Sequence, residues 1–150
     1  RIEQTGKSSN HTPWLISEIR IHENPLWRAD ASHHREQIHL AFDNREETAW
    51  TTGAPQSRGM WVTLDMARQE EVTGFVLKSR WHEEYPRGLL LEISPDGSEW
   101  ERILEVDDNR GDLDIDFPRP FKGRFLALLQ TSESPWYAWT ISELTVKRRR

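Results

Sequence analysis

The chain contains no cysteine, which excludes disulfide bonds, thiol catalysis and thiolate-bound metal sites. An excess of one charge is also lacking, because acidic and basic residues are mixed along the chain and the formal net charge is only −5. Proteins that bind nucleic acid or anionic membranes usually carry a strongly basic surface, so we expect no nucleic-acid partner. No apolar run is long enough to predict a transmembrane segment in this sequence.

Tryptophan, in contrast, is abundant, with eight residues among 150. Two classes of protein are rich in tryptophan: sugar binders, and proteins that fill their core with indole rings. A chain of this length normally forms one domain and buries roughly 70% of the surface that its unfolded form exposes. Because the sequence starts at Arg1 without methionine, we expect it to be part of a longer protein.

Apolar and polar residues alternate with a period of two over most of the chain, which predicts β-strands. Leu89, Leu91 and Ile93 show this alternation, and "SPDGSEW" at 94–100 supplies a turn to the next strand. Further strand candidates are 60–66, 113–117 and 124–131. No segment carries a long helical stripe, and only 36–42 predicts a helical turn. The pattern therefore favours an all-β sandwich or jelly roll.

Two segments read almost alike: "WLISEIRI" at 14–21 and "WTISELTV" at 139–146. They lie about the length of a β domain apart, as a tandem duplication would leave them. We therefore expect residues 1–24 to be the last strands of a preceding, similar module and residues 25–150 to form the β-sandwich domain. The alternative is that both segments are paired strands of one fold, with the chain ends side by side.

Each copy carries a glutamate at the point where its alternation reverses, namely Glu18 and Glu143. A bulge or a bend in the strand produces such a reversal and re-aims the side chain. The glutamate is then placed either to bind a metal ion or to face solvent.

Three stretches, taken in order, resemble the discoidin superfamily, that is, the coagulation factor V/VIII type C domains. They are "AFDNREETAWTTGAPQSRGMWVTLDM" at 41–66, "YPRGLLLEISPDGSEWERI" at 85–103, and "RFLALLQT" with "WYAWTISELTV" at 124–146. The likeness spans residues 27–147. It is greatest to the bacterial carbohydrate-binding modules, whose fold is called galactose-binding-domain-like. It implies a jelly-roll sandwich of about eight antiparallel strands, no catalysis, and ligand binding by loops at one end.

The acidic, turn-rich segment "FDNREETAW" at 42–50 is a candidate calcium loop, because hard cations bind several carboxylate, carbonyl and hydroxyl oxygens. In the bacterial modules the similar loop resembles a structural calcium site. The resemblance implies Asp43, Thr48 and Glu143 as ligands, with carbonyl oxygens around Phe42, Arg45 and Glu46. The alternative is a solvated acidic loop in which Thr48 and Glu143 hydrogen-bond each other.

Sugar recognition requires a flat aromatic face and planar polar groups that reach pairs of hydroxyls. Loops at 32–36, 80–87, 107–112 and 132–139 offer such sets. The residues that we expect to contact a glycan are Trp81, His82, Arg87 and Trp136, followed by His33 and Asn109. Alternatively, Trp81 lies in the core, and Arg87 pairs with Glu83 or Glu84 to hold its own loop. The tryptophans in strand patterns, expected in the core, are Trp50, Trp61, Trp100 and Trp139.

The sequence thus predicts a noncatalytic glycan-binding module with a structural calcium ion, appended to a larger secreted, periplasmic or cell-surface protein. Two alternatives remain: a protein- or lipid-interaction module, and a structural accessory domain of a membrane glycosyltransferase-like host. An enzyme is not expected. Glu83 and Glu84 are adjacent and point to opposite faces of a strand, whereas a glycosidase needs two carboxyl groups that converge on one bond.

Overall fold

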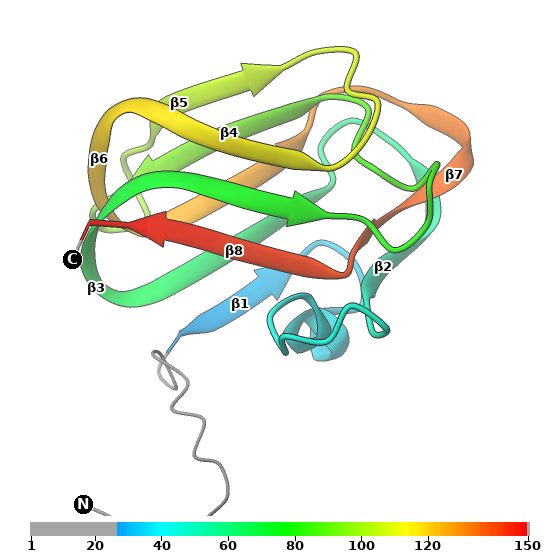
Figure 1. Cartoon of the computed structure of the whole chain (residues 1–150), viewed down its shortest axis with the longest axis horizontal. Helices are drawn as coiled ribbons and strands as arrows, with labels where there is room; N and C mark the ends of the chain where they lie inside the picture. The colour runs from blue at the N-terminus through cyan, green and yellow to red at the C-terminus, as the bar shows by residue number, and fades with distance from the viewer. Residues whose placement is uncertain (1–26, 150) are drawn as a thin grey trace, which may run out of the picture.

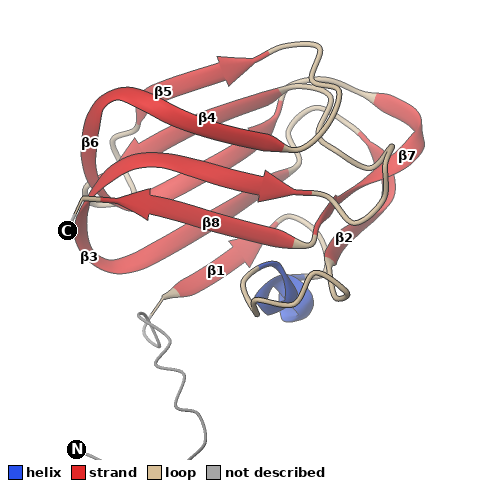
Figure 2. Ribbon diagram, in the orientation of Figure 1, coloured by secondary structure: helices blue, strands red, loops and turns tan. Residues whose placement is uncertain are grey.

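Strands dominate the computed structural model, which describes residues 27–149 (Figure 1). The strands are β1 (Arg28–Ala31), β2 (Trp50–Gln56), β3 (Trp61–Lys78), β4 (Leu89–Ser94), β5 (Glu101–Val106), β6 (Leu113–Gln130), β7 (Ser134–Ile141) and β8 (Glu143–Arg148). A 3₁₀-helix, η1 (Arg35–Ala41), follows β1, near the predicted helical turn, and Figure 2 sets it apart from the strands. The prediction of an all-β fold with eight antiparallel strands is confirmed. The prediction for residues 1–24 lies outside the described residues.

Two long strands, β3 and β6, give the molecule its two layers. The first part of β3 pairs with β1 and with the end of β6, and its second part pairs with β8 and with the start of β6. The β3–β6 register shifts between Asp65 and Glu70, and Ala67 in this bend has φ 64°. Figure 1 shows both strands curving from one layer into the other. One layer therefore has the order β1-β3-β6-β4-β5, and the other has β8-β3-β6.

The core lies between these layers and contains the apolar side of each alternating strand. Leu89, Leu91 and Ile93 are buried in β4, as the alternation predicts. At one end of the sandwich, Trp50 of β2 and Trp139 of β7 are fully buried and meet edge to face, with ring centroids 5.4 Å apart. The two strands pair with each other and close this end of the core.

The expected burial of tryptophan is right for Trp50 and Trp139 and wrong for Trp100, which is 37% exposed. Trp61 is only half-buried. Trp100 ends the turn that leads into β5, and β5 is an edge strand with few buried side chains, so the core does not enclose the indole ring.

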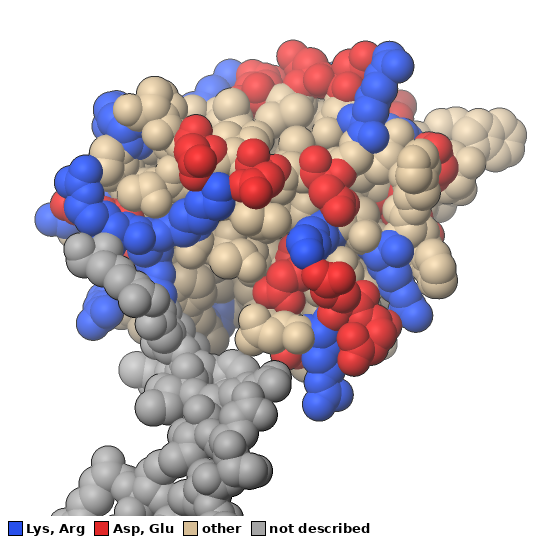
Figure 3. Space-filling view, viewed as in Figure 1, with Lys and Arg blue, Asp and Glu red and all other residues tan. Residues whose placement is uncertain are grey.

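Charged side chains of both signs are interspersed over the face in Figure 3, consistent with the mixed charge of the sequence. Many of them pair across strands: Arg124 of β6, for example, contacts Asp65 of β3 at 2.7 Å. Within residues 27–149, no helix is long and apolar enough to cross a membrane.

Candidate functional site

The buried side chain of Gln56 holds the loop between β3 and β4 against the end of the sandwich. Its amide nitrogen donates to the carbonyl oxygens of Tyr85, at 2.9 Å, and of Ala138, at 3.0 Å. Its amide oxygen accepts from the backbone N–H of Arg87 at 3.1 Å and from the side chain of Gln130. One glutamine at the end of β2 therefore fixes this loop relative to β6 and β7.

Further hydrogen bonds bring the neighbouring loops to the same end. The backbone N–H of Arg80 donates to the hydroxyl of Thr140 in β7, and the backbone N–H of Thr140 donates to the carbonyl of Glu84. The indole N–H of Trp50 donates to the carbonyl of His33 at 2.9 Å. The segments 32–34 and 79–88 thus lie against the β2–β7 pair, and 107–112 lies against 79–88, because the backbone N–H of Ser79 donates to the carboxylate of Asp112 at 2.8 Å.

A cavity of about 200 Å³ opens among these loops. The residues that line it are Ser79, Arg80, Trp81, His82, Tyr85, Arg110, Gly111 and Asp112. Trp81 is 59% exposed, so the alternative that it lies in the core is wrong. The guanidinium carbon of Arg80 lies 5.0 Å from the centre of the Trp81 ring. The cavity thus combines an exposed aromatic face with planar donors and a carboxylate.

Arg87 lies between two aromatic rings beside this cavity. Its guanidinium carbon is 4.2 Å from the centre of the Tyr85 ring and 5.5 Å from that of Tyr137. The guanidinium also donates to the carbonyl and the carboxylate of Glu83, at 2.9 and 3.1 Å. Arg87 therefore pairs with Glu83, as one alternative predicted, and the stack joins this loop to β7. The role of Arg87 as a glycan ligand stays a prediction.

The other predicted glycan contacts lie in different environments. Trp136 in β7 is 83% exposed. His82 is almost fully exposed and contacts Glu83 at 3.2 Å. The Nδ1 atom of His33 is 2.9 Å from the Ser32 hydroxyl.

Asn109 is buried, and its amide nitrogen donates to the carbonyls of Pro86 and Gly111, both at 2.9 Å. In the structure it joins the 79–88 loop to the 107–112 loop. Its role as a glycan ligand stays a prediction.

Six residues that line the cavity were not among the predicted contacts: Ser79, Arg80, Tyr85, Arg110, Gly111 and Asp112. Tyr137, which stacks on Arg87 beside the cavity, was not predicted either. Arg80 and Arg110 stand within loops that the sequence singled out, and Tyr137 directly follows Trp136. Composition identified these loops, but it gave no reason to prefer one arginine or one aromatic ring over its neighbour.

The predicted calcium loop folds around Asp43. The carboxylate of Asp43 accepts the backbone N–H of Arg45 at 3.0 Å and the hydroxyl of Thr48 at 2.7 Å. The Thr48 hydroxyl also lies 3.0 Å from the carbonyl oxygen of Arg45. The alternative in which Thr48 and Glu143 hydrogen-bond each other is wrong, because Asp43 and the loop backbone already accept from this hydroxyl.

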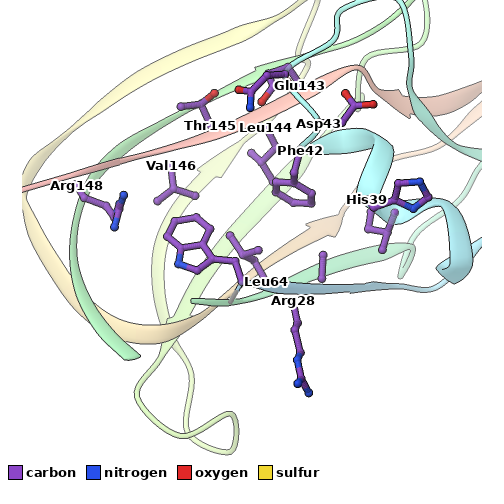
Figure 4. Close-up of a pocket in the computed structure, with 14 residues that line it drawn as sticks. Arg28, His39, Phe42, Asp43, Leu64, Glu143, Leu144, Thr145, Val146 and Arg148 are labelled. Atoms are coloured by element: carbon purple, nitrogen blue, oxygen red, sulfur yellow. The ribbon is translucent and has the colours of Figure 1, made fainter. Parts of the chain in front are cut away.

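Glu143 begins β8 beside this loop, and Figure 4 shows its carboxylate near that of Asp43. Its Oε2 atom is buried without a hydrogen-bond donor among the described residues. The pKa of Glu143 is raised, mainly by burial and to a smaller extent by the negative charge of Asp43. The backbone N–H of Asn44 opposes this shift. Glu46 instead forms an ion pair with Lys78. No group of three or more His, Asp or Glu side chains arranged to hold a metal ion occurs within residues 27–149.

Known structures share this fold. The module CpGH89CBM32-6 of Clostridium perfringens aligns with a TM-score of 0.70 and 19% identity, over 85% of this chain and 97% of its own. The family 32 carbohydrate-binding module of C. perfringens NanJ, solved in complex with galactose, aligns with a TM-score of 0.68 and 14% identity, over 80% and 92% of the two chains. Chitosan-binding module 1 of a Paenibacillus sp. IK-5 chitosanase/glucanase aligns with a TM-score of 0.67 and 21% identity, over 79% of this chain and 92% of its own.

No curated protein matches this chain in sequence. The F5/8 type C domain family matches residues 6–144, which is most of the chain. This match agrees with the jelly-roll sandwich and with the resemblance of the sequence to the discoidin superfamily. The chain therefore belongs to the F5/8 type C domain family.

Proposed function

We propose that this domain is a noncatalytic carbohydrate-binding module that binds a glycan at the cavity between the 79–88 and 107–112 loops. The observation that carries the proposal is the exposed indole of Trp81 on the cavity wall, with the guanidinium of Arg80 5.0 Å from the centre of its ring. The galactose complex of NanJ and the chitosan-binding module support it, because both have this fold.

The chemistry of the cavity suits a sugar. The face of an indole ring packs against the apolar face of a pyranose, and Arg80, Arg110 and Asp112 supply planar groups for its hydroxyls. Hydrogen bonds from Gln56 and Asn109 hold the loops in place, so little conformational entropy is lost when the ligand binds. Arg87 and Asn109 support the loops in this proposal, and Trp136 extends the aromatic surface along β7.

Calcium binding is the second part of the proposal. The residues fit a hard cation, since Glu143 has a buried oxygen without a donor and Asp43 places a second carboxylate beside it. Asp43, Glu143 and the hydroxyl of Thr48, with carbonyls near Arg45 and Glu46, would hold the ion and join β8 to the first loop. A bound cation would keep Glu143 charged despite its burial.

We place the domain outside the cytoplasm, as part of a larger protein that acts on or attaches to a polysaccharide. A binding module raises the local concentration of its host at the polysaccharide, so weak affinity is sufficient. One observation favours a second candidate, a lipid- or protein-binding module: Trp136 is 83% exposed, which is typical of a side chain that inserts into a partner surface.

Binding to a glycan panel, measured with calcium and with chelator, tests the proposal. Trp81→Ala should weaken binding of the best glycan at least about tenfold, or about 1.4 kcal/mol. Trp100→Ala is the matched control, since this indole is also exposed but lies at the far end of β4 from the 79–88 loop. Absence of glycan binding together with binding to phosphatidylcholine vesicles would favour the second candidate. An equal loss of glycan affinity in Trp81→Ala and Trp100→Ala would reject the assigned site.

A further inference from the structure

Arg80 differs from the other arginines of the 79–88 and 107–112 loops because it has no acidic partner within residues 27–149. Its exposed side chain lines the cavity between these loops. Arg87, in contrast, pairs with Glu83 at 3.1 Å, and Arg110 pairs with Asp108 at 2.8 Å. Arg80 is therefore the arginine at this site whose charge is not balanced by a carboxylate of the described residues.

The Trp81 ring holds the Arg80 guanidinium at the cavity. The guanidinium carbon lies over the indole, 5.0 Å from the ring centre, while the indole itself is 59% exposed. None of the guanidinium N–H groups donates to an oxygen within the described part of the chain. The planar N–H groups of an arginine form a fork that matches the two oxygens of a carboxylate. The cavity thus offers an aromatic surface and a carboxylate-binding group beside each other.

The acidic residues near the cavity are engaged by other groups. Asp112 lines the cavity, and its carboxylate accepts the backbone N–H of Ser79 at 2.8 Å. The carboxylate of Glu83 accepts from Arg87 at 3.1 Å. Glu84 does not line the cavity, and one of its carboxylate oxygens is buried. The lining itself contains two arginines and one aspartate, so it carries a small excess of positive charge.

The molecule as a whole does not attract anions. The formal net charge of the chain is −5, and the face in Figure 3 carries charges of both signs. Long-range attraction therefore does not draw an acidic polymer to this domain. A preference for an acidic ligand would come from a local contact, which a single substitution can remove.

We propose that the glycan bound at this cavity is acidic, and that Arg80 binds the carboxylate of a hexuronic acid residue whose ring packs on Trp81. The proposal rests on the glycan site proposed above and names the class of its ligand. In a hexuronic acid the carboxylate is attached directly to the pyranose ring, so a sugar that packs on the indole can place it against the neighbouring guanidinium. A neutral sugar offers this arginine only hydroxyls, and a hydrogen bond between two charged groups is stronger.

Calorimetric titration of the full chain with matched pairs of oligosaccharides tests the ligand class. Each pair consists of an oligomer of galacturonate, glucuronate or mannuronate and its neutral, carboxyl-reduced form. The chain should bind at least one acidic oligomer about tenfold or more tightly than the reduced form. Equal affinity for both forms of every pair would overturn the acidic ligand and leave the glycan site in place. Absence of binding to any acidic or neutral glycan would overturn both.

Substitution of Arg80 tests its role in this preference. Arg80→Gln should reduce the preference to less than about twofold, and Arg80→Lys, which keeps the charge but not the fork, should retain only part of it. Because the side chain is exposed, Tm should change by less than about 1 °C.

Arg102→Gln is the matched control. It removes the same charge from an exposed arginine near the start of β5, at the other end of that strand from the 107–112 loop. The control should keep the full preference for the acidic form. An equal loss of preference in Arg80→Gln and Arg102→Gln would show that net charge governs binding, and it would reject the contact between Arg80 and the carboxylate.

Discussion

At the scale of the residue, the two buried tryptophans of the core differ in one hydrogen bond. The indole N–H of Trp50 donates to the carbonyl of His33, whereas that of Trp139 is buried without an acceptor within the described range. Both rings are fully buried and pack against each other. Stability should therefore depend on the indole nitrogen at one position and not at the other.

We expect Trp50→Phe to reduce the free energy of unfolding by about 1 kcal/mol more than Trp139→Phe, because only the first change leaves the His33 carbonyl unsatisfied. Urea denaturation followed by circular dichroism measures both changes. Equal losses would show that ring size alone governs this part of the core.

Glu143 should make stability depend on pH in a direction unusual for a carboxyl group. Its pKa is raised in the folded state, so the folded state binds its proton more tightly than the unfolded state does. In chelator, stability should therefore decrease as pH rises from the ordinary value of 4.5 through the folded pKa. Glu143→Gln should remove this decrease. Calcium should raise Tm for the unmodified chain at pH 7 and not for Glu143→Gln.

Glu47 provides the control for this measurement, because it is exposed in the same loop. Glu47→Gln should keep both the pH dependence and the response to calcium. A Tm that calcium leaves unchanged in the unmodified chain would reject the proposed ion site without affecting the glycan proposal.

At the scale of the element, the β4–β5 hairpin was predicted correctly from the alternation at 89–93 and the turn "SPDGSEW". The carboxylate of Asp96 accepts the backbone N–H groups of Ser98 and Glu99, at 2.8 and 3.2 Å. The hydroxyl of Ser94 accepts the backbone N–H of Gly97, which has φ +83°. Local contacts of this kind depend only on neighbouring residues, so a short stretch of sequence was sufficient to predict the turn that they stabilise.

These backbone N–H donors lower the pKa of Asp96 to about 2. A carboxyl group with a lowered pKa stabilises the fold above its ordinary value of 3.8, and this contribution is lost as pH falls toward 2. Asp96→Ala should therefore lower Tm at pH 7, and its difference from the unmodified chain should decrease below pH 3.8. Asp96→Asn, which keeps one acceptor oxygen, should recover part of the loss. A difference that is the same at pH 2 and pH 7 would contradict this account.

At the scale of the whole molecule, β3 and β6 belong to both layers, so neither layer can unfold alone. Gly74 lies where β3 pairs with β6 on one side and with β8 on the other. A Cβ atom at this position would lie 2.2 Å from the carbonyl oxygen of Ile115. Gly74 therefore allows β3 and β6 to approach closely within the layer formed by β8, β3 and β6.

We expect Gly74→Ala to cost about 2 to 3 kcal/mol and to shift one cooperative transition without splitting it. Gly111→Ala is the control, because nothing lies within 4 Å of its added Cβ atom. Tryptophan fluorescence and far-ultraviolet circular dichroism should give the same midpoint for each variant. Separate midpoints would show that the two layers unfold independently.

The sequence by itself determined the class of fold, the strands with clear alternation and the loops whose side chains have groups suited to sugar binding. Alternation and turn residues act over a few neighbours, so they can be read without knowing the partner strands. For the same reason the sequence predicted Asp43 and Glu143 as a pair only through the resemblance to a family, since these residues are far apart in the chain.

Only the tertiary structure decided which loop residues face a common cavity and which serve as supports. Arg87 and Asn109 carry groups that suit sugar binding, yet Arg87 is stacked between Tyr85 and Tyr137, and Asn109 donates to two loop carbonyls. Arg80 instead lines the cavity beside Trp81. The direction of a loop side chain depends on contacts with distant segments such as Gln56 and β7, and no local pattern in the sequence records those contacts.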